Sequence, residues 1–424
     1  MKFSQYHISE ALKNNLHAMG FKKPTDIQFK AIPSIMKGED VLAVAHTGTG
    51  KTAAFAIPVI DRINKEKKNK RSQGIQCIVM VPTRELAQQI GNVFADLSKH
   101  TRVKCFSLYG GVEQNFQVKN LQSGIDVLVT TPGRMFDLIH QGYIQLNHIN
   151  TLILDEADRM LDPGFIRDIK FVKSMVKHRH QTLFFSATIN KEIKKLAFSQ
   201  VKSAAIRIQL SPRDPVSKNI SHYVMFVQMD DKRFFLERFV HEHPESKILV
   251  FVRTRVRAER VCSAMERVGI LSLTLHGEKD QHQRTEALQL FRQGACRLLI
   301  ATDISARGID IPDVDYVVNY DLPEIAENYV HRIGRTGRAF NRGVALSFCS
   351  QAEKELLEDI QKILSKTIDV IPVHKKDYAT TISFSKESDS LESLLRENEF
   401  PEKKKGKKGG KERAKKKAEK RKTG

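Results

Sequence analysis

The strongest constraint on the fold is a regular alternation of short apolar runs and longer amphipathic stretches, which occurs twice along the 424 residues. Each apolar run has four to six residues, and such runs are typical of strands buried on both faces. Strands of this kind that alternate with helices form parallel sheets covered by helices on both sides. We therefore predict an α/β fold. The predicted strands are residues 41–45, 77–81, 127–130, 151–154 and 182–186 in the first set, and 248–252, 272–275, 298–301, 314–319 and 343–348 in the second.

The two sets are separated by a polar segment, residues 209–217, that contains two prolines and has the composition of a linker. This predicts a first domain at residues 1–208, a linker at 209–218 and a second domain at 219–376. Residues 401–424 hold eleven Lys and two Arg against three Glu, and they lack a set of apolar residues that could form a core. We therefore predict that residues 377–424 are a mostly disordered basic tail.

The charge of the whole chain favours a polyanionic partner, because 70 Lys and Arg stand against 49 Asp and Glu, a net charge of +21. No apolar stretch approaches the roughly 18 residues of a membrane span, and the N-terminal residues lead into no apolar segment typical of a secretory signal. Five cysteines without paired spacing indicate reduced thiols and not a disulfide framework. These observations predict a cytoplasmic protein without a membrane partner.

A glycine-rich loop follows the first predicted strand and precedes a helical stretch, which is the context of a phosphate-binding loop. Glycines allow backbone N–H groups to surround phosphate oxygens, and the start of the helix adds a favourable dipole. Lys51 is then placed to contact the outer phosphates, and the Thr52 hydroxyl is placed to bind Mg²⁺. The predicted ATP-binding residues of this loop are Ala45, His46, Thr47, Gly48, Thr49, Gly50, Lys51 and Thr52.

Two adjacent carboxylates, Asp155 and Glu156, follow another buried strand and supply the acidic half of such a site. Asp155 can hold Mg²⁺ largely through water, and Glu156 can orient or deprotonate the attacking water. Lys51, Asp155 and Glu156 are therefore predicted catalytic residues, with Thr52 and Asp155 as the metal ligands.

The tetrad Asp155-Glu156-Ala157-Asp158 and the motifs around it resemble the DEAD-box RNA helicases, and the resemblance covers residues 1 to about 370. The similarity implies two RecA-like parallel-sheet domains in tandem, joined by a short linker, and an ATP-dependent RNA helicase. The matching segments, in the order of the family, are residues 20–28, 82–87, 110–111, 131–134, 155–158, 186–188, 250–254, Gln281 with Arg284, 301–310 and 331–338.

The same resemblance implies a role for individual residues. Phe3 is implied to stack on adenine and Gln28 to read its polar edge, with Phe21 and Thr25 in the same site and Gly308 and Asp310 near the ribose. The residues implied to couple hydrolysis to strand separation are Asp158, Ser186, Thr188 and His331. The residues implied to bind RNA are Arg84, Gly111, Thr131, Arg134, Arg253, Thr254 and Thr302.

Independently of the resemblance, the cations between His331 and Arg338 are too many for a buried core. Arginine forms paired hydrogen bonds with phosphate oxygens, and we expect Arg335 and Arg338 to reach ATP from the second domain. ATP and Mg²⁺ are thus the expected cofactors. RNA is the expected partner, bound without sequence preference as a single strand or short duplex, since contacts to backbone and 2′-hydroxyls carry little sequence information.

Other readings of the sequence remain. A related DNA helicase or translocase would use the same nucleotide site, and an RNA-binding clamp with an inactive site would keep the fold without turnover. A signalling GTPase would need an Asn-Lys-x-Asp segment, and the sequence has none. Within the family, the short N-terminal lead and basic tail resemble the bacterial RhlE-like branch. We expect a monomer, and ribosomal and RNA-decay assemblies are both open as settings.

Overall fold

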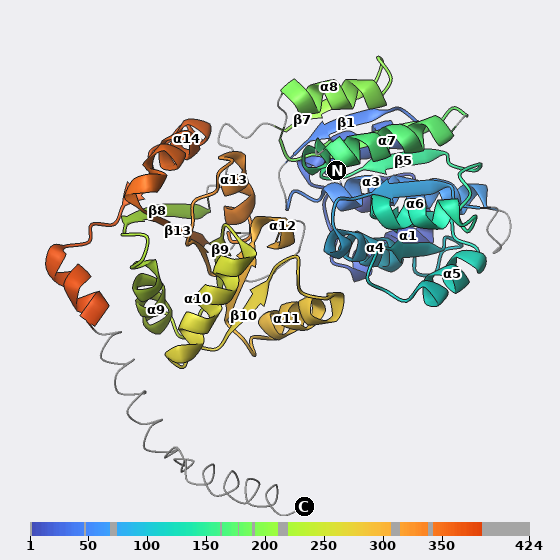
Figure 1. Ribbon diagram of the computed structural model, residues 1–424. Helices are drawn as coiled ribbons and strands as arrows, with labels where there is room; N and C mark the ends of the chain where they lie inside the picture. The colour runs from blue at the N-terminus through green and yellow to red at the C-terminus, as the bar shows by residue number, and fades with distance from the viewer. Residues whose placement is uncertain are drawn as a thin grey trace, which may run out of the picture.

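The computed structural model describes residues 2–45, 48–67, 74–161, 163–176, 178–188, 191–210, 219–306, 314–337 and 342–383. Within this part of the chain, two parallel sheets form two lobes that lie next to each other (Figure 1). Every strand pair in both sheets is parallel. The predicted α/β fold with two parallel-sheet domains is confirmed.

The first sheet has seven strands in the order β3-β4-β2-β5-β6-β1-β7. The five central strands are built from continuous apolar runs and are fully buried, as a sheet with helices on both faces requires. The strands are β1 (Val41–Val44), β2 (Cys77–Met80), β3 (Cys105–Leu108), β4 (Val127–Thr130), β5 (Thr151–Leu154), β6 (Gln181–Ser186) and β7 (Ile206–Gln209).

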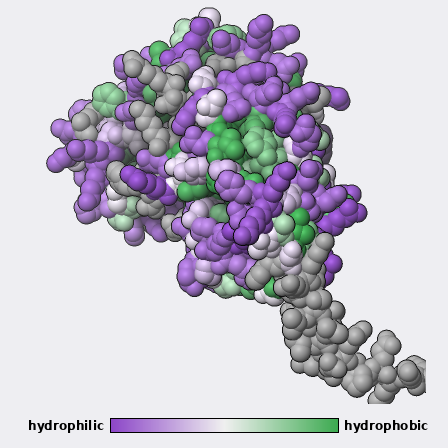
Figure 2. Space-filling model, turned by 90° about the vertical axis from the view of Figure 1, so that its left-hand side faces the viewer, coloured by the Kyte–Doolittle hydropathy of each residue, from purple (hydrophilic) through white to green (hydrophobic). Residues whose placement is uncertain are grey.

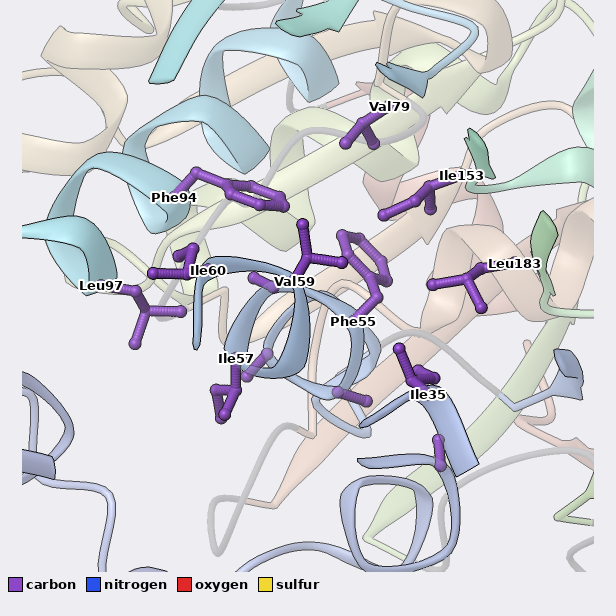
Figure 3. Close-up of a cluster of buried hydrophobic side chains, with 14 of the residues drawn as sticks. Ile35, Phe55, Ile57, Val59, Ile60, Val79, Phe94, Leu97, Ile153 and Leu183 are labelled. Carbon is purple, nitrogen blue, oxygen red and sulfur yellow. The ribbon is translucent and has the colours of Figure 1, made fainter. Parts of the chain in front are cut away.

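The helices of the first domain cover both faces of this sheet. One face packs against α1 to α4, and Figure 3 shows Phe55 of α3 among Ile153 and Leu183 of the sheet, with Phe94 of α4 beside it. The other face packs against α6, α7 and α8. The bounds are η1 (Phe3–Gln5), α1 (Glu10–Ala18), α2 (Asp26–Met36), α3 (Lys51–Glu66), α4 (Arg84–Ser98), α5 (Gln114–Gln122), α6 (Pro132–His140), η2 (Ala157–Leu161), α7 (Pro163–Met175) and α8 (Lys191–Gln200).

The second sheet repeats the topology of the first, with the order β10-β11-β9-β12-β13-β8-β14. Its strands are β8 (Ile220–Phe226), β9 (Ile248–Val252), β10 (Ser272–Leu275), β11 (Leu298–Thr302), β12 (Tyr316–Asn319), β13 (Gly343–Cys349) and β14 (Asp369–Val370). Its helices are α9 (Lys232–Glu242), α10 (Arg255–Arg267), α11 (Gln281–Gln293), α12 (Asp303–Ala306), α13 (Glu327–Ile333), η3 (Gln351–Glu353) and α14 (Lys354–Leu364). Helices α9 and α10 pack on one face, and α11, α13 and α14 on the other.

Order continues past the predicted end of the second domain, because residues 375–383 form a further helix (Figure 1). The ring of Tyr378 packs on Phe235 of α9 with 5.0 Å between centroids, and its hydroxyl donates to Asp231 Oδ2 at 2.7 Å. The expectation of disorder from residue 377 is therefore wrong for residues 377–383, because Tyr378 supplies an aromatic anchor. The rest of the predicted tail, residues 384–424, lies outside the described residues.

Two other boundaries differ from the sequence prediction. The predicted linker begins two residues too early, since Gln209 belongs to β7 and pairs with Val44, and the Leu210 N–H donates to the Val44 carbonyl at 2.9 Å. Residues 211–218 of that linker lie outside the described part. The sequence also missed β3, β7, β8 and β14, whose faces are partly exposed and whose residues therefore lack a continuous apolar run.

The described helices include none that is long and apolar enough to cross a membrane. Figure 2 shows one face of the molecule, which is mostly hydrophilic with an apolar patch near its centre.

Candidate nucleotide and nucleic-acid site

The glycine loop connects the end of β1 to the start of α3, as predicted. Gly50 precedes α3 with a φ of 89°, a left-handed conformation that glycine adopts without strain. Lys51 and Thr52 are the first two residues of the helix. The Lys51 ammonium is almost buried and donates to the carbonyl of Ala45 at 2.6 Å, so it points back across the loop. Backbone and ammonium donors thus converge at one helix start, the arrangement that binds phosphate.

Two side chains of the α2 segment hold this loop in place. The Thr25 hydroxyl donates to the Thr49 carbonyl at 2.7 Å, and the Gln28 amide donates to the Gly50 carbonyl at 3.1 Å. The Gln28 Oε1 atom accepts from the Thr25 N–H at 2.9 Å, which completes a capping box at the start of α2. A Cβ atom on Gly50 would lie 2.4 Å from Gln28 Nε2, so only glycine fits there. Thr25 and Gln28 are therefore brought to the nucleotide loop, as the resemblance implied.

Phe3 does not lie where the sequence placed it. Its ring is 3% exposed and packs against Tyr6 and Phe21, with the Phe21 centroid 5.9 Å away. A covered ring has no open face for a base, so the stacking role predicted for Phe3 is wrong in this structure. Phe21 is partly exposed and contacts Phe3 edge-on, which makes Phe21 the aromatic residue of this segment that can meet a ligand.

The predicted acidic pair follows β5 and is buried. Burial raises the pKa of Asp155 to about 6, while the Lys51 charge acts in the opposite direction and the Glu156 carboxylate adds to the rise. Glu156 has a φ of 52°, a left-handed conformation that costs a non-glycine residue on the order of 1–3 kcal/mol. The Glu156 carboxylate pairs with Arg159 at 2.6 Å. The sequence reasoning missed Arg159, although its position three residues after Glu156 is a spacing that allows such a pair.

The donor set here fits Mg²⁺. Asp155 is a buried carboxylate close to the positive charge of Lys51, and Thr52 supplies a hydroxyl at the second position of α3, directly after the loop. The described residues include no group of three or more His, Cys, Asp and Glu that could hold a metal ion by themselves. Magnesium is usually bound by one or two carboxylates together with substrate phosphates. Asp155 and Thr52 therefore match a site that a nucleotide completes.

The coupling residues meet where the two domains touch. Asp158 Oδ2 accepts from the Thr188 hydroxyl at 3.3 Å and lies 3.5 Å from His331 Nε2 of the second domain. The Ser186 hydroxyl donates to the Thr188 carbonyl at 2.7 Å. Burial alone would raise the pKa of Asp158, but the hydrogen bond and charge of His331 hold that pKa well below its usual value. All four predicted coupling residues are thus in one chain of contacts.

The two described arginines near His331, Arg332 and Arg335, are both buried but have different partners. Arg332 is fully buried, forms a paired contact with Asp303 at 2.6 and 2.8 Å, and donates to the Asp321 carbonyl at 2.6 Å. The expectation that these cations are too many for a buried core is therefore wrong, because the Asp303 carboxylate neutralises Arg332 and the Asp321 carbonyl accepts one of its N–H groups. Arg335 follows α13 and donates through Nε to the His331 carbonyl at 3.3 Å. This ties Arg335 to the residue that contacts Asp158.

The candidate RNA residues of the first domain follow three neighbouring strands. Arg84 begins α4 after β2, Gly111 follows β3, and Thr131 precedes α6 after β4. The Arg84 guanidinium lies over the glycine pair, since a Cβ on Gly111, whose φ is 83°, would be 2.7 Å from Arg84 Nη1. Arg134 is held by Gln117 at 2.8 Å, and by Gln114 and Asp137.

The candidate RNA residues of the second domain lie at the matching edge of the second sheet. Arg253 and Thr254 follow β9, and Thr302 ends the neighbouring β11. The Thr254 hydroxyl accepts from the Arg257 N–H at 3.2 Å and caps α10, as the Thr83 hydroxyl caps α4 by accepting from Leu86 at 3.3 Å.

A second contact between the domains was not in the predicted site. Glu85 of α4 and Arg284 of α11 form a nearly buried ion pair, with Glu85 Oε1 at 2.7 Å from Nε and 2.5 Å from Nη2. Both residues stand in segments that match the family, but nothing in the sequence indicates that they pair. Five predicted site residues lie outside the described part of the chain, namely His46, Thr47, Gly308, Asp310 and Arg338.

Comparison with known proteins agrees with this geometry. Residues 25–196 match the family model of the DEAD/DEAH box helicases, and residues 231–340 match the helicase conserved C-terminal domain. DEAD-box ATP-dependent RNA helicase CshA of Bacillus subtilis (strain 168) is 38% identical over 367 residues, which are 87% of this chain and 73% of CshA. The chain belongs to the DEAD-box helicase family. Its assignment to the RhlE-like branch stays a prediction.

Solved structures of relatives share the fold of this DEAD-box chain over most of its length. Dbp5 of S. cerevisiae bound to RNA and ADP BeF3 has a TM-score of 0.80 at 32% identity, covering 91% of this chain and 99% of Dbp5. A Dbp5 variant bound to Nup159, a Gle1 variant, IP6 and ADP has a TM-score of 0.59 at 28% identity, covering 92% of this chain and 100% of the Dbp5 chain. Both comparisons cover more than nine-tenths of this chain, and the overall similarity is higher for the structure of Dbp5 with RNA and ADP BeF3.

Proposed function

We infer that this chain is an ATP-dependent RNA helicase, which couples ATP binding and hydrolysis to local, non-processive remodelling of RNA duplexes and RNA–protein complexes. The observation that carries this inference is the contact of 3.5 Å between Asp158 and His331. Asp158 belongs to the acidic segment of the first domain. The backbone carbonyl of His331 accepts a hydrogen bond from Arg335 Nε. Closure of the two domains thus brings an arginine of the second domain to the phosphate side of the first.

Nucleotide and RNA binding use different strand ends along the same sheet edge. In the first sheet, β5 and β1 lead into the candidate nucleotide residues, and β6 between them ends in the coupling residue Ser186; β3, β4 and β2 lead into the candidate RNA residues. Ligands of open α/β sheets bind at the carboxyl ends of the strands. ATP and RNA therefore occupy adjacent parts of one edge, and each contacts both domains. Since both ligands favour the closed arrangement, each raises the affinity for the other by the same factor.

The roles of the residues follow from their positions. Lys51 and the loop N–H groups hold the outer phosphates, and Glu156 orients and deprotonates the attacking water. Arg335, with Arg338, neutralises the charge that develops on the transferred phosphate, and such arginines contribute on the order of 10³–10⁵ in rate. Thr52 and Asp155 would hold Mg²⁺, which would supply positive charge to stabilise the charge on the phosphate groups. Phe21 and Gln28 contact the base.

Remodelling follows from closure. Arg84, Gly111, Thr131 and Arg134 from one side, with Arg253, Thr254 and Thr302 from the other, bind the backbone of one strand and bend it away from duplex geometry. At about 1.4 kcal/mol for each stacked step, by the value for DNA, one closure opens only a short duplex. We further propose that the chain acts as a monomer in the cytoplasm, in ribosomal or RNA-decay assemblies.

The test compares RNA and DNA of the same sequence as stimulators of ATP turnover, and then measures separation of a short RNA duplex. We expect turnover to rise with RNA and to rise far less with DNA. Equal stimulation by DNA would assign the chain to DNA helicases or translocases. RNA binding without any turnover would make it an RNA clamp.

A further inference from the structure

A buried ionic cluster lies in the second domain beneath its candidate RNA residues. We define the second-domain cluster as Lys232, Asp321 and Glu353, with Arg253 and Arg257 at its margin. The Lys232 ammonium is fully buried, 2.6 Å from Glu353 Oε2 and 3.7 Å from Asp321 Oδ1. It also donates to the Tyr320 carbonyl at 2.7 Å. An ammonium buried this deeply is stable only with such partners.

Arg253 connects the second-domain cluster to the candidate RNA residues of this domain. The Arg253 N–H donates to Asp321 Oδ2 at 3.0 Å, and its guanidinium donates to Glu353 Oε1 at 3.4 Å. Glu353 Oε1 also accepts from the Leu322 N–H at 3.1 Å, and Arg257 lies 3.1 Å from Asp321 Oδ2. Two buried carboxylates therefore fix both the backbone and the side chain of Arg253, whose own side chain is 36% exposed.

The position of this cluster matches that of the nucleotide site in the first domain. Lys232 is the first residue of α9 after β8, as Lys51 is the first residue of α3 after β1, and β8 and β1 hold the same place in their sheets. Asp321 lies just after β12, the counterpart of β5, which Asp155 follows. In the first domain the lysine stands where a phosphate binds. In the second domain the lysine meets a carboxylate of the chain itself, Glu353.

We infer that Glu353 permanently takes the place of a nucleotide phosphate in the second domain, and that Glu353 and Lys232 are positioning residues for RNA binding by Arg253 and Thr254. This inference rests on the proposed function. Glu353 pairs with the Lys232 ammonium. Asp321 can therefore accept the hydrogen bond from the Arg253 N–H and fix the backbone at the end of β9. The RNA residues of the second domain are therefore set without ATP, whereas those of the first domain share their sheet edge with the nucleotide.

The test is the RNA concentration at half-maximal stimulation of ATP turnover in the full-length chain, for Glu353→Gln and for the double variant Lys232→Met with Glu353→Gln. We expect this concentration to rise about tenfold in both, the effect of one lost hydrogen bond to a charged group. The ATP concentration at half-maximal rate, measured at saturating RNA, should stay within twofold. The double variant removes both buried charges, so it keeps the test valid if Glu353→Gln alone does not fold.

Glu324→Gln is the matched control. Glu324 also lies beside Arg253, 3.6 Å from its Nε, but its side chain is 70% exposed. Loss of an acidic group near a phosphate-binding arginine should strengthen RNA binding slightly if charge alone matters. Positioning predicts opposite signs: weaker RNA binding for the two Glu353 variants, and unchanged or slightly stronger binding for Glu324→Gln.

Two results would overturn the positioning role of Glu353, and a third, separate result would overturn the proposed function. If the double variant folds and matches the wild type in its RNA requirement, Glu353 does not position Arg253. If Glu353→Gln strengthens RNA binding as Glu324→Gln does, the cluster acts only through its charge. If the wild type itself shows no stimulation by RNA, the proposed function fails before the variants are compared.

Discussion

The two domains share one strand order but use the same sheet edge differently. In the first domain, Lys51 and the buried Asp155 face the place of an exchangeable ligand, and Glu156 is held in a left-handed backbone conformation. In the second domain, Lys232 has the same topological position and is enclosed by Glu353 and Asp321. The same sheet topology thus gives a catalytic site when the lysine can bind a ligand. It gives a fixed binding surface when an internal carboxylate neutralises the lysine.

The largest effect that separates the two edges should come from Glu156→Gln. We expect turnover to fall by about 10³-fold, because the amide cannot accept the proton of the attacking water. Binding of a fluorescent ATP analogue and of RNA should persist, which distinguishes lost chemistry from misfolding. Turnover close to that of the wild type would remove Glu156 from the reaction.

The two lysines provide a direct contrast. Lys232→Met should lower the free energy of unfolding by about 3–5 kcal/mol, because it removes the buried ammonium between Glu353 and Asp321 and leaves only the cations at the margin of the cluster. Lys51→Met should instead abolish ATP turnover with a much smaller change in stability. Urea unfolding and a turnover assay on both variants measure this. If the two variants lose stability equally, the distinction between an exchangeable and an internal partner is wrong.

The buried carboxylates of the two edges should also respond to pH in opposite directions. The pKa of Asp155 is raised from 3.8 to about 6, so the folded state holds this proton more tightly, and the associated stability is lost as the pH rises through 6. The pKa of Glu353 is lowered: burial opposes ionisation, but the Lys232 charge and hydrogen bonds outweigh it. Its contribution is present above the unfolded pKa and is lost as the pH falls.

Asp155→Asn should therefore stabilise the ligand-free chain at pH 7 by about 3 kcal/mol at most, and by nothing below pH 3.8. Glu353→Gln should destabilise it at pH 7, and the difference should shrink in acid. Thermal unfolding from pH 3.5 to 7.5 measures both curves. Two parallel curves would show that the carboxylates have similar surroundings.

The smallest effect concerns the contact between the domains. Glu85→Ala and Arg284→Ala should each weaken closure by about 1 kcal/mol, or roughly fivefold, and the double variant should lose little more than either single one. Small-angle scattering with RNA and a non-hydrolysable ATP analogue measures the compact fraction. Additive losses would show that Glu85 and Arg284 do not act as a pair.

The sequence predicted the parts of the fold that follow from local pattern. All ten predicted strands correspond to strands of the structure, because a strand buried on both faces needs a continuous apolar run. Strand β14, at the edge of the second sheet, has exposed residues and leaves no such run, and it was missed. The position of the glycine loop next to the acidic segment was predicted, since both follow strands of one parallel sheet.

The rest depends on contacts between residues far apart in the chain. Glu85 and Arg284 are 199 positions apart, and Lys232 and Glu353 are 121 apart, so no spacing indicates either pair. The role of Phe3 at the base comes from the family resemblance alone, and the sequence does not show whether an aromatic residue stacks on a ligand or packs in the core. The sequence also does not predict the burial of Arg332, because its partner Asp303 is distant in the chain. The pair is recognised only when α13 is placed against the end of β11.

The close fit of Gly50 against Gln28 has a practical consequence for building chimeras of related helicases. The glycine loop and the segment at residues 25–28 interlock through two side-chain hydrogen bonds and leave no space for a Cβ atom. A crossover point placed between them would join halves that were not selected together. Recombination junctions should therefore lie before residue 25 or after the first turn of α3, so that both pieces come from one parent.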